Sequence, residues 1–250
     1  MFFDSHAHMT EESMFEEVDA YLKRAKQAGI THIANICTDK LTLARGIELQ
    51  KRYDWIVNVG ATTPHDVGEL GEKEFDVFAK AARDGVLAAV GETGLDYHYE
   101  YSDKKVQKLF LERYLDLADE TDLPVVFHCR DAFDDLFAIT KGIKSKAVLH
   151  CFTAGVKEAL KGAERGWYIS ISGIATFKRS HELREVIKEL PIENMFIETD
   201  APYLAPQSKR GKRNEPSFIV ETAEMIAEVK GLTLEQVAKQ TMNNAKAFFL

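Results

Sequence analysis

Short apolar segments alternate along the chain with longer segments whose apolar residues recur at helical spacing. The short segments are rich in β-branched and aromatic residues, and they fall at residues 2–3, 31–36, 55–59, 86–90, 124–127, 147–149, 167–171 and 195–197. Short, mostly apolar runs of this kind are typical of strands buried on both faces of a parallel sheet. The pattern therefore predicts eight strands.

The first of the longer segments shows the helical spacing clearly. Its apolar stripe consists of Met14, Val18, Tyr21, Leu22 and Ala25. Gly29 follows this stripe, and glycine suits the left-handed position at which many helices end. We expect a helix that ends at this glycine.

Capping residues predict three further helix starts. Ser102 precedes a long helical segment that ends before residues 122–124, and Ser180 precedes another. A serine hydroxyl at such a position accepts a hydrogen bond from a backbone N–H of the first helical turn. Thr233 and Gln236 form a capping-box pattern before the last helical segment.

Eight strand candidates alternating with helices over 250 residues predict an α/β fold, a (β/α)8 TIM barrel rather than a doubly wound sheet. The sequence has no internal repeat, and no linker rich in proline, glycine or serine. Residues 202–216 form the one loop-like stretch. We therefore expect residues 1–250 to form a single domain.

Ionisable residues follow five of the predicted strands at their carboxyl ends. They are His6, His8, Glu92, His128, His150 and Asp200. In a (β/α)8 barrel these ends share one rim, and that rim is where active sites lie. The period of two along a strand also places His6 and His8 on the same side. The six side chains are thus predicted to converge.

Imidazole and carboxylate ligands suit zinc, manganese, magnesium or similar divalent ions. Six side chains exceed the number that one zinc ion usually takes, so two ions that share a carboxylate are the simplest arrangement. Glu92 comes from a strand between the two pairs of histidines, which makes it the expected bridge.

Each of these residues taken alone has a structural explanation. A His-x-His pair occurs by chance on surfaces, and a strand-end carboxylate often caps a helix or forms an ion pair. His128 and His150 could each be core histidines. It is the set of six at one rim that favours a metal site.

Composition limits the partners of the protein. Forty Asp and Glu residues against 32 Lys and Arg give a formal net charge of −8, so attraction to a nucleic acid must be local. The chain has three cysteines, an odd number without metal-type spacing, which suits the reducing cytoplasm. No apolar run of about 18 residues and no signal peptide is evident, so we expect no membrane association. No obligate protein partner is evident either.

Six blocks of sequence resemble those of a known family. They read FFDSHAHM at 2–9, GETGLDY at 91–97, PVVFHCRDA at 124–132, HCFTAG at 150–155, IETDAPYL at 197–204 and RNEP at 213–216. In this order they are similar to the TatD-like metal-dependent deoxyribonucleases of the amidohydrolase superfamily. The resemblance spans nearly the whole chain.

The resemblance implies a hydrolase of DNA phosphodiester bonds that uses two divalent metal ions (Zn, Mn or Mg) and acts on single strands or 3′ ends. It implies the same six ligands: His6, His8, Glu92, His128, His150 and Asp200. Asp200 would also accept the proton of the attacking water, which makes Asp200 and Glu92 the candidate catalytic carboxylates. Asp4, Asp96 and Glu198 would either hold ligand imidazoles from behind or make ordinary hydrogen bonds.

The chain departs from the family pattern at two positions. Thr10 stands where the family usually has Asp or Asn, and Thr63 stands at the first histidine of the family's Gly-x-His-Pro-His segment. The second departure puts a substrate contact in question more than it does the metal site.

Candidate substrate contacts lie beyond the predicted strands. Four basic residues, Lys209, Arg210, Lys212 and Arg213, would contact a phosphate backbone or simply form a solvated face. Arg130, two residues after His128, is a candidate for binding phosphate. Asn214 belongs to the last resembling block. Tyr97, with Tyr99 and Tyr101, would stack on single-stranded bases or pack within its own loop.

Two other functions stay open from the sequence. The first is hydrolysis of a small cyclic amide, ester or phosphotriester. Many superfamily enzymes of that kind bridge their ions with a modified lysine at the end of strand four, where this chain has Glu92. The second is a barrel that binds metal or a partner without catalysis.

Overall fold

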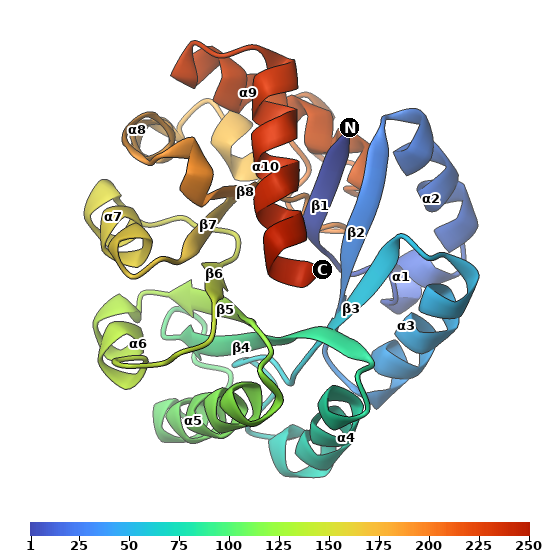
Figure 1. The fold of residues 1–250 in the computed structure, drawn as a ribbon, viewed down its shortest axis with the longest axis vertical. Coiled ribbons are helices and arrows are strands. Elements are labelled where there is room, and N and C mark those ends of the chain that lie inside the picture. Colours follow the sequence, from blue (N-terminus) through green and yellow to red (C-terminus); the bar gives the residue numbers. More distant parts are fainter. The chain divides into compact units, whose positions relative to one another are not determined.

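The computed structural model describes residues 1–250, which group into two compact units (Figure 1). The first unit consists of Met1–Asn35 and Cys151–Leu250, and the second of Ile36–His150. The prediction that residues 1–250 form one domain stays a prediction.

The first unit holds the two ends of the chain. Its strands are β1 (Phe2–Ala7), β2 (Ile30–Cys37, whose last two residues belong to the second unit), β7 (Tyr168–Ile171) and β8 (Met195–Ile197). Its helices are α1 (Glu12–Phe15), α2 (Val18–Gln27), α7 (Val156–Glu164), α8 (His181–Glu189), α9 (Ile219–Lys230) and α10 (Leu234–Phe249). Short 3₁₀ helices are η1 (Gly173–Thr176), η2 (Ile192–Asn194), η3 (Gln207–Lys209) and η4 (Pro216–Phe218).

The second unit holds the middle of the chain. Its strands are β3 (Ile56–Gly60), β4 (Leu87–Asp96), β5 (Val125–Arg130) and β6 (Ala147–Leu149). Its helices are α3 (Lys40–Arg52), α4 (Gly71–Arg83), α5 (Lys104–Thr121) and α6 (Phe133–Ile139).

The strands follow one another in the sheet in the order of the sequence, from β1 to β8. The pairs β1/β2, β3/β4, β4/β5, β5/β6 and β7/β8 are parallel. Helices separate the consecutive strands. This is the element order of the (β/α)8 fold, so the predicted fold class is confirmed.

Aromatic packing in the first unit fixes the strands that lead to the candidate ligands. The last helix, α10, lies beside β1 in Figure 1 and packs on both β1 and β8. The ring of Phe249 stacks on Phe3 of β1 at 5.5 Å, and that of Phe248 meets Phe196 of β8 edge-on at 5.4 Å. Truncation of a buried Phe typically costs about 3–5 kcal/mol, so these contacts fasten α10 to β1 and β8.

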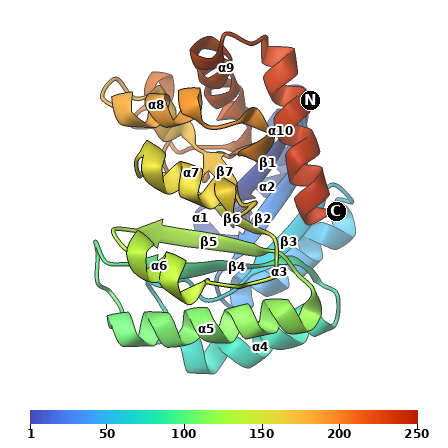
Figure 2. The same ribbon diagram turned by 60° about the vertical axis from the view of Figure 1, so that its left-hand side comes forward.

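In the second unit, α5 runs alongside β4 and supports the segment that follows β3 (Figure 2). Tyr114 of α5 is fully buried, and its hydroxyl accepts a hydrogen bond from Thr62 N at 2.9 Å. The same hydroxyl lies 3.2 Å from Thr62 Oγ1. These contacts fix the start of the segment that carries His65.

The predicted strands all exist, but five of them end later than predicted, and β1, β4 and β5 do so by three residues or more. The apolar segments end at residues 3, 90 and 127, whereas β1 continues to Ala7, β4 to Asp96 and β5 to Arg130. The end of β4 is stabilised by pairing with β5, from Thr93 opposite Phe127 to Asp96 opposite Arg130. This extension is polar and non-local, so an apolar pattern does not reveal it.

The helix caps agree with the sequence only in part. The Thr233/Gln236 capping box is present. Asp103, and not Ser102, caps α5, because the Ser102 hydroxyl is bonded to Gly68 N and His65 O instead. Ser180 stands at the start of α8, but its hydroxyl donates to Ile174 O. None of the helices combines the length and apolar character that crossing a bilayer requires.

Candidate metal centre

The first unit gathers three of the predicted ligands into one cluster, which we call the first cluster: His6, His8 and Asp200. Nε2 of His6 lies 3.3 Å from Nε2 of His8. Oδ1 of Asp200 lies 3.6 Å from His6 Nε2 and 3.5 Å from His8 Nε2. All three residues are buried. The predicted same-side placement of the two histidines is thus present.

Main-chain hydrogen bonds bring Asp200 to the end of β1. Its N–H donates to His6 O at 2.9 Å, and the N–H of His8 donates to Ala201 O at 2.7 Å. Asp200 has φ +58°, in the left-handed region that Asp and Asn tolerate better than most residues. The turn directs the carboxylate back toward both imidazoles.

Asp4 holds this turn and not an imidazole. One carboxylate oxygen accepts from Thr199 N at 2.9 Å, and the other accepts from the Thr199 hydroxyl at 2.6 Å. Burial raises the pKa of Asp4 to about 7, against the lowering effect of these hydrogen bonds. Of the two sequence interpretations of Asp4, ordinary hydrogen bonding describes the structure.

Asn214 and Arg213, two predicted substrate contacts, both make contacts within the first unit. The Asn214 amide donates to Thr199 O at 2.7 Å and to Tyr203 O at 2.6 Å, so it braces the Asp200 turn. Arg213 donates to Ser13 O at 2.6 Å. That either residue contacts substrate stays a prediction.

The second unit gathers the other three predicted ligands into the second cluster: Glu92, His128 and His150. Oε1 of Glu92 lies 2.9 Å from His128 Nδ1 and 2.9 Å from His150 Nε2. The two imidazole nitrogens are 3.2 Å apart. The residues come from β4, from β5 and from the position after β6, which are consecutive strands.

Asp96, at the end of β4, fixes the orientation of the His128 ring. Its Oδ2 lies 2.9 Å from His128 Nε2, on the opposite side of the ring from the atom that faces Glu92. Burial alone would raise the pKa of Asp96, but the hydrogen bonds from His128 and from Tyr99 N outweigh it and the pKa falls to about 2. With Nε2–H donated to the ionised Asp96, Nδ1 is the atom of His128 that faces Glu92 and that would bind a metal ion in place of a proton.

The second cluster favours positive charge. Burial by itself would lower the pKa of His128, but Asp96 and Glu92 raise it. A site that stabilises a proton on a buried imidazole by means of two carboxylates also stabilises a cation among the same groups. The electrostatics of this cluster therefore suit a divalent ion.

The ligand spacing of the first cluster is that of a tetrahedral metal ion, and the atoms of the second cluster lie a few tenths of an ångström closer together. An ion with bonds of about 2.0–2.1 Å in tetrahedral arrangement holds its ligand atoms about 3.3–3.5 Å apart. The separations are 3.3–3.6 Å in the first cluster and 2.9–3.2 Å in the second. Each set combines imidazole nitrogens with one carboxylate, the donors that zinc and manganese accept.

Arg130 and Tyr97 lie just beyond the second cluster. The guanidinium of Arg130 lies over the ring of Tyr99 at 4.8 Å. The hydroxyl of Tyr97 donates to Asp135 at 2.7 Å, and Lys104 lies over its ring. Their role in substrate binding stays a prediction.

His65 is a residue to which the sequence assigns no role. Its Nε2 lies 3.6 Å from Asp96 Oδ2, and its ring centre is 5.1 Å from that of His128. The one signal in the sequence is its place after Pro64 in the segment that resembles the family's Gly-x-His-Pro-His, beside the departure at Thr63.

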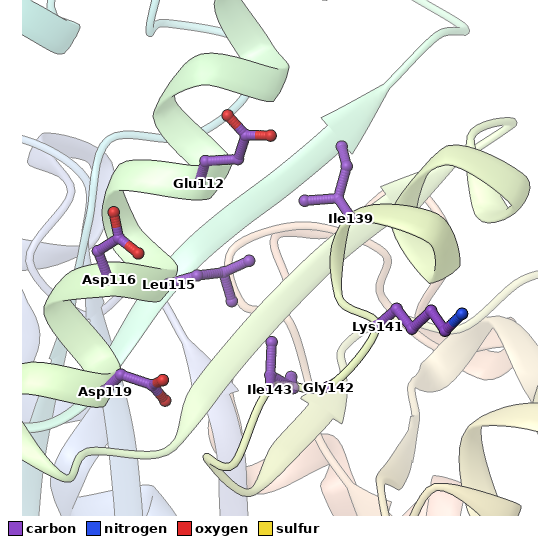
Figure 3. Close-up of a pocket in the computed structure, with 8 residues that line it drawn as sticks. All are labelled: Glu112, Leu115, Asp116, Asp119, Ile139, Lys141, Gly142 and Ile143. Atoms are coloured by element: carbon purple, nitrogen blue, oxygen red, sulfur yellow. The ribbon is translucent and has the colours of Figure 1, made fainter.

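A separate hollow of about 220 Å³ lies between α5 and the segment after α6 (Figure 3). Leu115, Ile139 and Ile143 point toward one another there, and three acidic residues of α5 lie along one side. The lining contains none of the six predicted ligands. The hollow therefore gives no support to a second candidate active site.

The fold and the two clusters define a class of protein: a (β/α)8 barrel with groups of imidazoles and carboxylates near the carboxyl ends of its strands. A family profile described as "TatD related DNase" matches residues 3–250. The chain belongs to this family and is a metal-dependent hydrolase.

Individual proteins show how far the similarity extends. An "Uncharacterized metal-dependent hydrolase YabD" of Bacillus subtilis is 36% identical over 252 residues, which cover 100% of this chain and 99% of that protein. A "3'-5' ssDNA/RNA exonuclease TatD" of Erwinia tasmaniensis is 31% identical and covers 99% of both chains. The crystal structure of YJJV, a TatD homologue from Escherichia coli, has a TM-score of 0.93 at 27% identity, covering 99% of this chain and 97% of that one.

Proposed function

We propose that this enzyme hydrolyses phosphodiester bonds of single-stranded DNA and removes nucleotides from the 3′ end. The observation that carries the proposal is the pair of clusters, each of which brings two imidazoles and one carboxylate within 3.6 Å of one another. Membership of a DNase family implies nucleic acid as the substrate. The preference for single strands and for the 3′ end rests on the name of a relative that is 31% identical.

His6, His8 and Asp200 would hold one divalent ion, and Glu92, His128 and His150 would hold the other. Bound divalent ions lower the pKa of water and neutralise the charge that grows on the phosphate oxygens. That Glu92 is shared between the ions stays a prediction from the sequence.

Asp200 is the proposed proton acceptor for the attacking water. The Asp200 turn is held by main-chain hydrogen bonds to β1 and by Asn214, so the carboxylate keeps one orientation. Asp96 holds His128 in the tautomer that exposes Nδ1. In this proposal the chain positions the substrate and moves one proton.

End-labelled oligonucleotides test the proposal. Protein reconstituted separately with Zn²⁺, Mn²⁺ or Mg²⁺ is incubated with single-stranded DNA labelled at the 5′ end, and in parallel with DNA labelled at the 3′ end. We expect the 5′ label to appear in a ladder of progressively shorter strands and the 3′ label to appear at once in mononucleotide. EDTA and the Asp200→Asn variant serve as controls, and both should abolish shortening.

Three results would contradict the proposal. If no metal supports shortening of DNA, the proposed nuclease activity is rejected. A parallel assay with small phosphotriesters, esters and cyclic amides would then test the other hydrolase function. Internal fragments would indicate an endonuclease. Mononucleotide released first from the 5′ label would reverse the polarity.

A further inference from the structure

The loop that follows β4 carries two exposed tyrosines that stack on each other. The rings of Tyr99 and Tyr101 have centres 5.3 Å apart and an interplanar angle of 11°. Tyr99 is 47% exposed and Tyr101 is 72% exposed. The pair therefore presents an aromatic surface to solvent instead of burying it in the core.

Hydrogen bonds hold this loop in a fixed conformation. Oδ1 of Asp96 accepts from His98 N and from Tyr99 N, each at 2.9 Å. The Gln107 side chain donates to Ser102 O at 2.9 Å and to Asp96 O at 3.0 Å. The tyrosine pair thus sits on a loop that is anchored on both sides.

The same Asp96 carboxylate connects the loop to the second cluster. While Oδ1 holds the loop, Oδ2 holds His128 Nε2 at 2.9 Å. The His65 ring lies 5.1 Å from the His128 ring, and 5.6 Å from Tyr101 and 5.8 Å from Tyr99. A chain of ring contacts therefore leads from a predicted metal ligand to the exposed tyrosines.

Positive charge accompanies the aromatic pair. The Arg130 guanidinium lies 4.8 Å above the Tyr99 ring, and Arg130 is the residue paired with Asp96 across β4 and β5. Arginine beside an exposed aromatic ring is a combination that suits a nucleotide, because the ring takes a base and the cation takes a phosphate.

We propose that Tyr101 and Tyr99, with Arg130 beside them, form a stacking subsite for a nucleobase of the substrate strand. A base that stacks on Tyr101 would extend the existing pair to a three-ring stack, and Arg130, over the Tyr99 ring, would bind a phosphate of the same strand. Stacking accepts every base, so the subsite favours single strands without reading their sequence. This inference rests on the proposed nuclease function and identifies the part of the substrate that the enzyme holds.

The subsite is tested by combining a change in the protein with a change in the substrate. Wild type and Tyr101→Ala are compared on two single strands, one normal and one whose nucleotides near the 3′ end lack bases. Stacking on an aromatic side chain gives about 5- to 100-fold in affinity per base. We expect Tyr101→Ala to raise KM by such a factor on the normal strand and to change it less than about two-fold on the abasic strand.

Matched variants separate stacking from other effects. Tyr101→Phe keeps the ring and should behave as wild type on both strands. Leu109→Ala removes an exposed apolar side chain of α5 outside the loop. It should leave the KM unchanged on both the normal and the abasic strand. Equal losses on normal and abasic strands, or no loss on either, would overturn the subsite.

A binding measurement keeps this test independent of catalysis. In EDTA, an oligonucleotide with 2-aminopurine near its 3′ end should lose fluorescence on binding to wild type and to Tyr101→Phe, and should keep it with Tyr101→Ala. If the wild-type protein quenches the fluorescence but shortens no DNA, the proposed subsite stands and the proposed nuclease function is rejected. If the enzyme shortens DNA but wild type and Tyr101→Ala quench the fluorescence equally, the proposed function stands and the proposed subsite is rejected.

Discussion

Two buried aspartates, Asp4 and Asp96, lie beside the two clusters, and their environments shift their pKa values in opposite directions. Asp4 accepts hydrogen bonds from the neutral groups of Thr199, and its burial raises its pKa to about 7. Asp96 is equally inaccessible to solvent, but hydrogen bonds from His128 and from Tyr99 N hold its pKa at about 2. Near neutral pH, Asp96 is therefore ionised while a large fraction of Asp4 is protonated.

The difference shows two ways to position metal ligands. In the first cluster the main chain does the positioning, because backbone hydrogen bonds join Asp200 and Ala201 to the end of β1. In the second cluster the strand register brings the ligands together, and one ionised side chain sets the tautomer of His128. The first arrangement should tolerate loss of the aspartate charge, and the second should not.

The largest expected effect is the loss of one ion from one cluster. We expect His8→Ala and His150→Ala each to lower the metal content from two ions per chain to one. Because a bound ion contributes several kcal/mol to the transition state, cleavage of single-stranded DNA should fall by about 10³-fold or more. Elemental analysis after dialysis and the rate of shortening measure the two effects.

His181→Ala is the matched control for both histidine variants, because His181 is an exposed residue of α8 that contacts Arg184 and no cluster residue. It should retain two ions and full activity. Loss of both ions from either His8→Ala or His150→Ala would show that the clusters do not bind independently, and the comparison between them would fail.

A smaller effect is expected from neutralising the aspartates one at a time. In Asp96→Asn the amide oxygen can still accept from the loop, but the NH₂ group then faces His128 Nε2 and forces the proton onto Nδ1. The second cluster should bind its ion about 10- to 100-fold more weakly. Asp4→Asn replaces a carboxyl group whose pKa burial raises to about 7, and it should change affinity at the first cluster less than about three-fold. Competition with a metal chelator measures both affinities, and equal losses would contradict the proposed difference.

The sequence predicts the strands best where an apolar run is the whole strand. Residues 147–149 and 195–197 are predicted with the bounds that β6 and β8 have. The end of β4 cannot be predicted in this way, because residues 92–96 are mixed in polarity and are held by pairing with β5. Ser102 and Asp103 are both good capping residues, and a distant contact of Ser102 with His65 and Gly68 decides between them.

The residues of the candidate site also differ in whether a local sequence pattern reveals them. Period and composition are enough to infer that six residues lie near the carboxyl ends of strands: His6, His8, Glu92, His128, His150 and Asp200. The only local mark of His65 is its place after Pro64 in the segment that resembles the family's Gly-x-His-Pro-His, and its significance comes from its contacts with Asp96 and His128 on other strands. The division between Asp4 and Asp96 also depends on non-local partners, so their opposite pKa shifts could not be predicted.

The smallest expected effect concerns an ion pair that supports the Asp200 turn from outside. Nε and Nη2 of Arg24, in α2, donate to the Glu215 carboxylate at 2.7–3.0 Å, and Glu215 follows the bracing residue Asn214. The side chain of Glu215 is 10% exposed and that of Arg24 is 43% exposed. We expect Glu215→Gln to lower the free energy of unfolding of the metal-free protein by about 1–2 kcal/mol at pH 7.

The pH dependence of this loss identifies its cause. Burial would raise the pKa of Glu215, but the hydrogen bonds from Arg24 and Ser217 lower it below the ordinary value of 4.5. Stabilisation by a carboxylate with a lowered folded-state pKa is complete above the ordinary value and is lost as the pH falls through the lowered one. The difference in the free energy of unfolding between wild type and Glu215→Gln, measured in urea, should therefore shrink on acidification.

Glu120→Gln is the matched control, because it breaks a similar but more exposed pair with Arg83 in the second unit. It should lower the free energy of unfolding by less than Glu215→Gln does. Equal losses from the two variants would mean that burial of Glu215 adds nothing to the support of the first cluster.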